Sequence, residues 1–271
     1  MADTPPQVGA LELKKGKIMN TKELYQKLKE SFLKLIAEHH LEQEPVKISC
    51  RALSVEEAIG ETKRKDFPII TGKDIMIQAE YKNGRGQAFT DAPTLFEGTL
   101  KDICQLDIEN DSHARGVFIA SLNAVMNSLG LCKACVHCRK DGPELCAIDM
   151  KEYLNQQWPK AKRIGLVGCQ PAILQMLSES EREVRVLDLN LANIGSIRYG
   201  VKVEDGATAR EDLIEWADLI LCTGSTLCNG TIVDYLDLKT IVVFYGITAS
   251  GACQLFGWNR VCFADKYEAQ Q

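Results

Sequence analysis

Four short apolar runs in the C-terminal half of the chain constrain its fold more than any other feature. They end at or next to glycine or aspartate and span Arg163–Gly168, Val184–Leu189, Leu219–Gly224 and Thr240–Gly246. The stretches between them that show helical periodicity are Ala172–Glu179, Thr208–Ala217 and Thr231–Leu236. Apolar strands that alternate with helices form a parallel sheet with helices on both faces. We therefore predict a Rossmann-like domain over residues 162–271.

The preceding part of the chain shows the pattern of an α+β domain. Apolar residues recur at helical spacing over Leu24–Ile36 and again over Ala114–Leu129. Between these two helices, apolar and polar residues alternate over 75–90 around an Asn-Gly pair, which predicts a β-hairpin. We expect an N-terminal α+β domain over residues 1–148, followed by a polar connection at Asp149–Lys162.

Composition and charge limit the class of protein. The chain has 271 residues, a formal net charge of −5 and 45% hydrophobic residues, which is ordinary for a globular protein. The negative charge argues against a nucleic-acid partner, and no apolar run has the roughly 18 residues of a membrane helix. The first residues also lack the apolar core of a signal peptide. We therefore expect a cytoplasmic protein without a membrane partner, and a homodimer is left open.

The carboxyl edge of the predicted parallel sheet is the first candidate site, because ligands of open α/β sheets bind there. The first strand ends at Gly168, and Asp188 follows twenty residues later, where a ribose-binding carboxylate often lies. The turn after Gly168 lacks the G-x-G-x-x-G pattern, which disfavours ordinary NAD binding. Asp188 equally suits the cap of a turn.

The loop after the third predicted strand is the stronger signal at this edge. It contains Thr223, Gly224, Ser225, Thr226 and Asn229. Small hydroxyl residues and glycines between a strand and a helix present backbone N–H groups to an anion. The alternative is a plain loop in which Asn229 serves only as a turn residue. A similar loop begins at Gly246 after the fourth strand.

The cysteine-rich segment 132–146 is the second candidate site. It has the spacing C-x2-C-x2-C-x7-C, formed by Cys132, Cys135, Cys138 and Cys146. In a reducing compartment most of the 11 cysteines are thiols or metal ligands, and four thiolates can hold zinc or an Fe–S cluster. We predict such a metal centre. The alternative is an extension of the preceding helix that buries the first three thiols on one face.

Other cysteines follow the predicted strands. Cys169, Cys228 and Cys253 all lie just beyond strand carboxyl ends, so they could line one crevice and bind a soft metal. Cys222 lies within a strand, and we assign it and Cys262 to packing. Signatures of common enzymes such as G-x-S-x-G, H-E-x-x-H and the P-loop are absent, so it stays open whether the chain is an enzyme.

Several motifs together resemble the heavy-metal chelation family. They are Gly116–Ala124, Ala217–Ile220, Thr223–Thr226, Asn229–Thr231 and Val243–Thr248. The resemblance covers roughly residues 70–260. It implies an N-terminal domain like that of enolase joined to a Rossmann-like domain, with a cleft between them. It further implies a role with metal chelators or with pterin- or flavin-like molecules.

We therefore expect a protein that binds a metal, or a small molecule that chelates a metal, at the cleft between the two domains. Asp91 at the end of the hairpin and Arg115 at the start of the long helix are the candidates from the first domain, since arginine can clamp a carboxylate or phosphate. The alternative is an enzyme that acts on a nucleotide-, pterin- or S-adenosylmethionine-like molecule, with structural cysteines. The candidate ligand-binding residues are Asp91, Arg115, Gly168, Asp188, Thr223, Gly224, Ser225, Thr226, Asn229 and Gly246.

Overall fold

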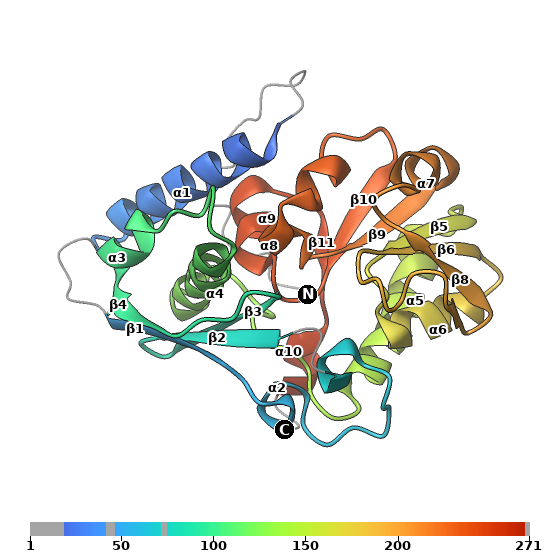
Figure 1. The fold of residues 1–271 in the computed structure, drawn as a ribbon, viewed down its shortest axis with the longest axis horizontal. Coiled ribbons are helices and arrows are strands. Elements are labelled where there is room, and N and C mark those ends of the chain that lie inside the picture. Colours follow the sequence, from blue (N-terminus) through green and yellow to red (C-terminus); the bar gives the residue numbers. More distant parts are fainter. Residues whose placement is uncertain (1–18, 42–46, 72–74, 269–271) are drawn as a thin grey trace.

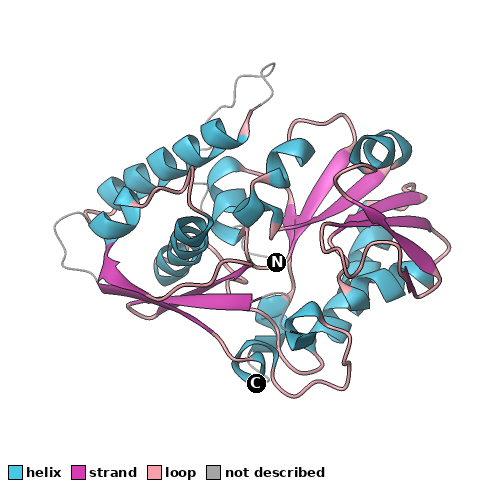
Figure 2. Cartoon of the chain, in the orientation of Figure 1, coloured by secondary structure: helices cyan, strands magenta, loops and turns pink. Residues whose placement is uncertain are grey.

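Two β-sheets lie side by side in the computed structural model, which describes residues 19–41, 47–71 and 75–268 (Figure 1). The first sheet has four antiparallel strands in the order β3-β2-β1-β4. Its strands are β1 (Lys47–Ala52), β2 (Ile75–Tyr81), β3 (Gly84–Thr90) and β4 (Phe96–Thr99). Helices α1 (Thr21–Glu38), α3 (Leu100–Gln105) and α4 (Ser112–Ser128) lie together on one face of this sheet (Figure 2). The predicted hairpin and both predicted helices of this region are confirmed.

Helix α4 approaches the first sheet unusually closely. A Cβ atom added at Gly86 on β3 would lie 2.2 Å from the backbone nitrogen of Ala124 on α4. Only glycine therefore permits this packing. As a result, nearly every side chain of α4 between Val117 and Met126 is buried, including the polar Ser121 and Asn123.

The second sheet is mostly parallel, with the strand order β11-β10-β9-β5-β6-β8-β7. Its parallel strands are β5 (Arg163–Val167), β6 (Glu183–Asp188), β8 (Val201–Asp205), β9 (Leu219–Thr223), β10 (Ile241–Tyr245) and β11 (Arg260–Val261). The short edge strand β7 (Ile197–Arg198) pairs antiparallel with β8. Strands β5, β6, β9 and β10 match the four apolar runs of the sequence. The chain is therefore an α/β protein, and its strand order reverses between β5 and β9.

Helices cover both faces of the second sheet. They are α5 (Gly142–Gln157), α6 (Pro171–Ser178), α7 (Arg210–Trp216), α8 (Thr226–Asn229), the 3-10 helix η2 (Thr231–Tyr235), α9 (Ser250–Phe256) and α10 (Ala264–Glu268). Met150 and Leu154 of α5 pack with Leu174 of α6 in the core on one face. Helix α5 thus occupies much of the segment that the sequence predicts as a connection.

The core on the other face is shared with the first sheet. Leu227 of α8 and Phe244 of β10 belong to the same cluster of buried side chains as Phe32 of α1 and Phe118 of α4. The two sheets are therefore joined by one continuous apolar core. None of the helices among the described residues could cross a membrane.

The segment between β1 and β2 crosses from the first sheet to the second. It carries α2 (Val55–Ile59) and the 3-10 helix η1 (Pro68–Thr71). Arg64 anchors it, because its guanidinium donates to Glu144 on α5, to Gln175 on α6 and to the hydroxyl of Tyr199 beside β7. We call residues 60–71 the strap.

Candidate functional site

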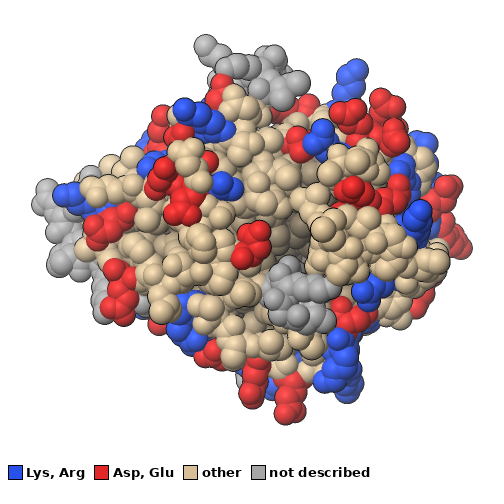
Figure 3. Space-filling model, in the orientation of Figure 1, with Lys and Arg blue, Asp and Glu red and all other residues tan. Residues whose placement is uncertain are grey.

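A cavity of about 810 Å³ lies at the carboxyl edge of the second sheet. The turn after β5 and the loops after β6, β9 and β10 form its wall on this side, and β3 and the strap form the other side. The charged side chains on the face seen in Figure 3 lie mostly around its periphery, and the middle of this face carries few of them. The cavity therefore occupies the place where the sequence predicts a site.

Tyr245 at the end of β10 ties the strand ends together. Its hydroxyl lies 3.1 Å from the carbonyl oxygen of Val167 and 3.0 Å from that of Gly168, to which it donates. Its own carbonyl accepts the N–H of Gly224 at 2.8 Å. Burial raises the pKa of the Tyr245 hydroxyl well above its usual range, so this group remains a hydrogen-bond donor. The wall formed by these three strand ends is therefore rigid.

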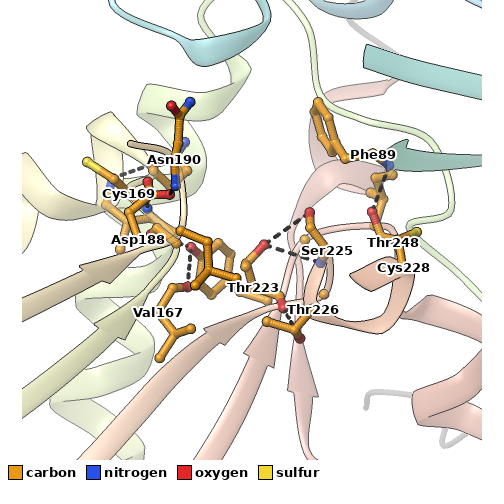
Figure 4. A pocket seen from close by; sticks show the side chains of 18 of the residues that line it. Phe89, Val167, Cys169, Asp188, Asn190, Thr223, Ser225, Thr226, Cys228 and Thr248 are labelled. Carbon is orange, nitrogen blue, oxygen red and sulfur yellow. Dashed lines mark hydrogen bonds between the residues drawn. The ribbon is translucent and has the colours of Figure 1, made fainter. Parts of the chain in front are cut away.

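The loop after β9 is held by its own hydroxyl groups. Thr226 Oγ1 donates to the carbonyl of Thr223 at 2.7 Å, and Thr223 Oγ1 lies 3.3 Å from Ser225 Oγ. Figure 4 shows these three side chains between Asp188 on one side and Thr248 on the other. The loop thus presents small polar groups to the middle of the cavity.

Asp188 also lines the cavity, but its carboxylate caps the loops around it. It accepts the N–H groups of Asn190 at 2.8 Å and Cys169 at 3.2 Å, and the amide of Asn193 at 2.9 Å (Figure 4). The sequence left two roles open for Asp188, a ribose-binding carboxylate and a turn cap. These contacts are those of a turn cap. A ribose hydroxyl would have to compete with three existing donors.

Asp91 and Arg115, the candidates from the first domain, occupy different places. Asp91 lines the cavity and is exposed at its edge. Arg115 does not line it: Nη1 donates to the carbonyl of Cys228 at 3.2 Å, and the guanidinium lies 5.1 Å from the ring of Tyr25. That Arg115 contacts the ligand stays a prediction, and in this structure its side chain turns toward the loop after β9. It supports the wall from behind, and the other nine candidate residues line the cavity.

The four cysteines of the predicted metal centre lie in two pairs. Residues 131–139 form a loop, so the alternative of a helix extension is wrong. Cys132 and Cys135 lie close to each other in the main core, where both thiols donate to the carbonyl of Lys133, whereas Cys138 and Cys146 lie close to each other beside the cavity. Within the described residues, no group of three or more His, Cys, Asp or Glu side chains is arranged to hold a metal ion.

The three cysteines at strand ends do not share one crevice. Cys169 and Cys228 line the cavity, but Cys253 is buried on α9 in the main core. Burial raises the pKa of the Cys169 thiol to about 11 and that of the Cys228 thiol to about 12. Both thiols are therefore protonated at neutral pH and unreactive.

Several lining residues have no clear signal in the sequence. Ile59, Phe67 and Ile69 come from α2 and the strap, and Phe89 comes from β3. His137 also lines the cavity, and burial lowers the pKa of its imidazole to about 4, which keeps the ring neutral. Its ring packs edge-on against Phe89 with a centroid distance of 5.5 Å. Only the long-range packing of these segments brings them to the site.

Comparison with known proteins supports the resemblance found in the sequence. Residues 153–258 match the model of the DUF364 family, which is described as "Putative heavy-metal chelation". Over these residues the chain is similar to the DUF364 family. The DUF364 match includes the turn after β5 and the loops after β6, β9 and β10, but not the first sheet or the cysteine-rich segment.

Two solved DUF364 structures are similar to this chain. One is a protein of unknown function from Pyrococcus horikoshii, with 17% identity, a TM-score of 0.47 and coverage of 86% of this chain and 80% of that one. The other is a protein of unknown function from Desulfitobacterium hafniense, with 16% identity, a TM-score of 0.38 and coverage of 62% and 66%. No curated protein matches the chain.

Proposed function

We propose that the cavity binds a small organic molecule that chelates a metal ion. The observation that carries this proposal is the cavity itself, because about 810 Å³ lies within the range of sites for small organic ligands. The description of the DUF364 family supports the metal. In this proposal the N-terminal domain (1–148) resembles that of enolase, and the ligand lies between it and the Rossmann-like domain (162–271).

The lining favours a ligand with an apolar body and a polar edge. Phe67, Phe89 and Ile173 supply flat or branched apolar surface, while Ser225 and Asn229 supply hydroxyl and amide groups. A chelator with aromatic or aliphatic arms fits this division, since the arms would contact the apolar wall. Its metal-binding oxygen or nitrogen atoms would then face the polar loop after β9.

A separate zinc or Fe–S centre on all four cysteines of the 132–146 segment has less support. A zinc ion and an Fe–S cluster both need ligands that converge on one place. The pair of Cys132 and Cys135 and the pair of Cys138 and Cys146 lie in different clusters of buried side chains, so the loop that joins them would have to rearrange.

The alternative function is an enzyme that acts on a nucleotide-, pterin- or S-adenosylmethionine-like molecule. One observation favours it, namely that the cavity lies at the carboxyl edge of a parallel sheet where the strand order reverses. The contacts of Asp188 argue against this enzyme. Its carboxylate, which would bind a ribose hydroxyl, already accepts three hydrogen bonds from within the protein.

Isothermal titration calorimetry on the full chain distinguishes the two functions. The probes are 2,2′-bipyridine with and without Fe(II), ferric citrate, flavin mononucleotide and S-adenosylmethionine. The proposal expects a metal complex to bind and the metal-free bipyridine to bind more weakly. Binding of flavin mononucleotide or S-adenosylmethionine alone would favour the enzyme, and absence of binding by both metal complexes would overturn the proposal.

A matched pair of variants locates the binding. Ser225→Leu adds apolar volume within the cavity, so it should abolish the heat of binding of the metal complex. Ser112→Leu makes the same change on a half-buried serine at the start of α4, outside the cavity, and should leave binding unchanged. Equal effects of the two substitutions would place the ligand elsewhere.

A further inference from the structure

Three thiols from three separate segments line one side of the cavity. Cys138 comes from the loop before α5, Cys146 from α5 itself, and Cys262 from the residues between β11 and α10. Cys138 belongs to one small buried cluster, against which both Cys146 and Cys262 pack. The sequence alone assigned Cys262 to packing and grouped Cys138 and Cys146 with Cys132 and Cys135, so this arrangement was not predicted.

The start of α5 brings two of these thiols together. Gly142 and Cys146 are four residues apart and therefore lie on the same face of the helix. A Cβ atom added at Gly142 would lie 2.7 Å from Cys138 Cβ and 3.5 Å from its sulfur, so Cys138 packs directly on this face. Cys138 and Cys146 are close enough there for their thiols to interact. The glycine thus makes room for the pair.

Charges of both signs lie near Cys146. The ammonium group of Lys266 and the carboxylate of Asp149 are both close to its sulfur. The guanidinium of Arg260 lies close to the neighbouring Cys262. By contrast, Cys132 and Cys135 are buried in the main core and do not line the cavity.

We propose that Cys138 and Cys146 form a two-thiolate site for a soft monovalent metal ion of the Cu(I) class, open to the cavity. Soft thiolate ligands select such ions, and a d¹⁰ monovalent ion accepts two-coordinate sulfur, whereas structural zinc requires four ligands. Among the described residues, no group of three or more His, Cys, Asp or Glu side chains is arranged to hold a metal ion. The site therefore has two sulfur donors. Binding forms two sulfur–metal bonds and releases the proton of each thiol to solvent, with no change of oxidation state.

This site is independent of the organic ligand of the proposed function, because the chain supplies both metal ligands itself. An entering ion reaches the sulfurs through the cavity, since both cysteines line it. The site therefore remains testable if no chelator binds. Conversely, a chelator could bind at the loop after β9 in a variant that lacks these two thiols.

The test is an anaerobic titration of the reduced full chain with Cu(I) in competition with bicinchoninate, a coloured Cu(I) chelator. We expect the wild-type chain to withdraw one tight equivalent of Cu(I), and we expect Cys138→Ser and Cys146→Ser to lose it. Cys132→Ser and Cys135→Ser change the other pair of neighbouring thiols and should keep the equivalent. Loss of the equivalent in all four variants would overturn the two-thiolate site and favour a four-thiol centre, and loss in Cys262→Ser would overturn two-coordinate binding.

A second measurement needs no variant and decides the matter if a substitution prevents folding. The wild-type chain is treated with iodoacetamide with and without one equivalent of Cu(I), and the labelled cysteines are identified by mass spectrometry. We expect Cu(I) to slow labelling of Cys146, which is half-buried at the cavity, more than labelling of the similarly half-buried Cys104 outside it. Equal labelling of Cys146 with and without Cu(I) would overturn the proposal.

Discussion

Asn123 on α4 donates its side-chain amide to the carbonyl of Thr248 at 3.0 Å, and this bond joins the first sheet's main helix to the loop after β10. The same amide donates to the carbonyl of Gln87 on β3 at 3.0 Å, and its oxygen accepts the N–H of Gly251 at 2.8 Å. Thr248 in turn accepts the backbone N–H of Phe89 on β3 at 3.0 Å. Fully buried Asn123 thus fixes the position of one cavity wall relative to the other.

The first prediction concerns this residue. Asn123→Ala leaves the buried carbonyls of Gln87 and Thr248 and the N–H of Gly251 without their partner, so we expect a loss of about 3 kcal/mol of unfolding free energy. Asn127→Ala, one turn later on α4, removes weaker contacts from a half-buried amide and should cost less than about 1 kcal/mol. Urea denaturation followed by circular dichroism measures both. Equal losses would show that Asn123 does not join the two sheets.

The second prediction tests the close approach of α4 to β3. The added Cβ of Gly86→Ala would lie 2.2 Å from a backbone nitrogen and 2.4 Å from a backbone oxygen of α4, neither of which can move aside alone. We expect a loss of more than about 3 kcal/mol of unfolding free energy, or failure to fold. Gly116→Ala on α4 is the control. Its Cβ would lie 3.1 Å from the flexible end of Ile77, and alanine favours the helix, so stability should change little.

Much of the second sheet could be predicted from the sequence because its central strands are buried on both faces. Such strands read as continuous apolar runs, and β5, β6, β9 and β10 all do. Strand β8 was not predicted because it lies near the edge of the sheet and has the mixed sequence VKVED, of which only Val203 is buried. Helix α5 has few buried residues, so its sequence resembles a polar connection.

The candidate site was predictable to the extent that strand topology determines it. The carboxyl ends of parallel strands meet at one edge, so the turn at Gly168 and the loops at Ser225 and Gly246 were placed together correctly. The sequence does not show which way a side chain on α4 points, and Arg115 turns toward Cys228 and Tyr25 instead of the cavity. The strap reaches the cavity only through long-range contacts, which leave no local pattern.

The third prediction concerns acid stability. Asp218 accepts hydrogen bonds from the Arg163 guanidinium and from the backbone N–H groups of Lys162 and Arg163, and these bonds lower the pKa of its carboxyl to about 2. A lowered folded-state pKa adds stability above the unfolded value near 4, and this contribution disappears as the pH falls from about 4 to about 2.

Asp218→Asn should therefore cost about 1 kcal/mol at pH 7, a modest value because the side chain is partly exposed, and the difference from wild type should disappear near pH 2. Arg163→Gln keeps the two backbone bonds to Asp218 and should cost less at pH 7. Urea denaturation at a series of pH values measures both variants. A cost that does not change with pH would contradict the assigned cause.

The last prediction concerns the strap. Arg64 is largely buried and bonds to Glu144, Gln175 and Tyr199 on the second sheet's side, so it holds the strap over the cavity. Arg64→Met removes these bonds and leaves Glu144 without its cation, so residues 60–71 should exchange amide hydrogens faster and be cleaved faster by trypsin at Lys63 and Lys65.

Lys63→Met is the control for exchange, because Lys63 is 90% exposed and forms only a 3.4 Å ion pair with Asp141. We expect it to leave exchange across the strap near the wild-type rate, since exposed ion pairs contribute little. If Arg64→Met exchanged as slowly as Lys63→Met, the apolar contacts of Phe67 and Ile69 alone would be sufficient to hold the strap in place.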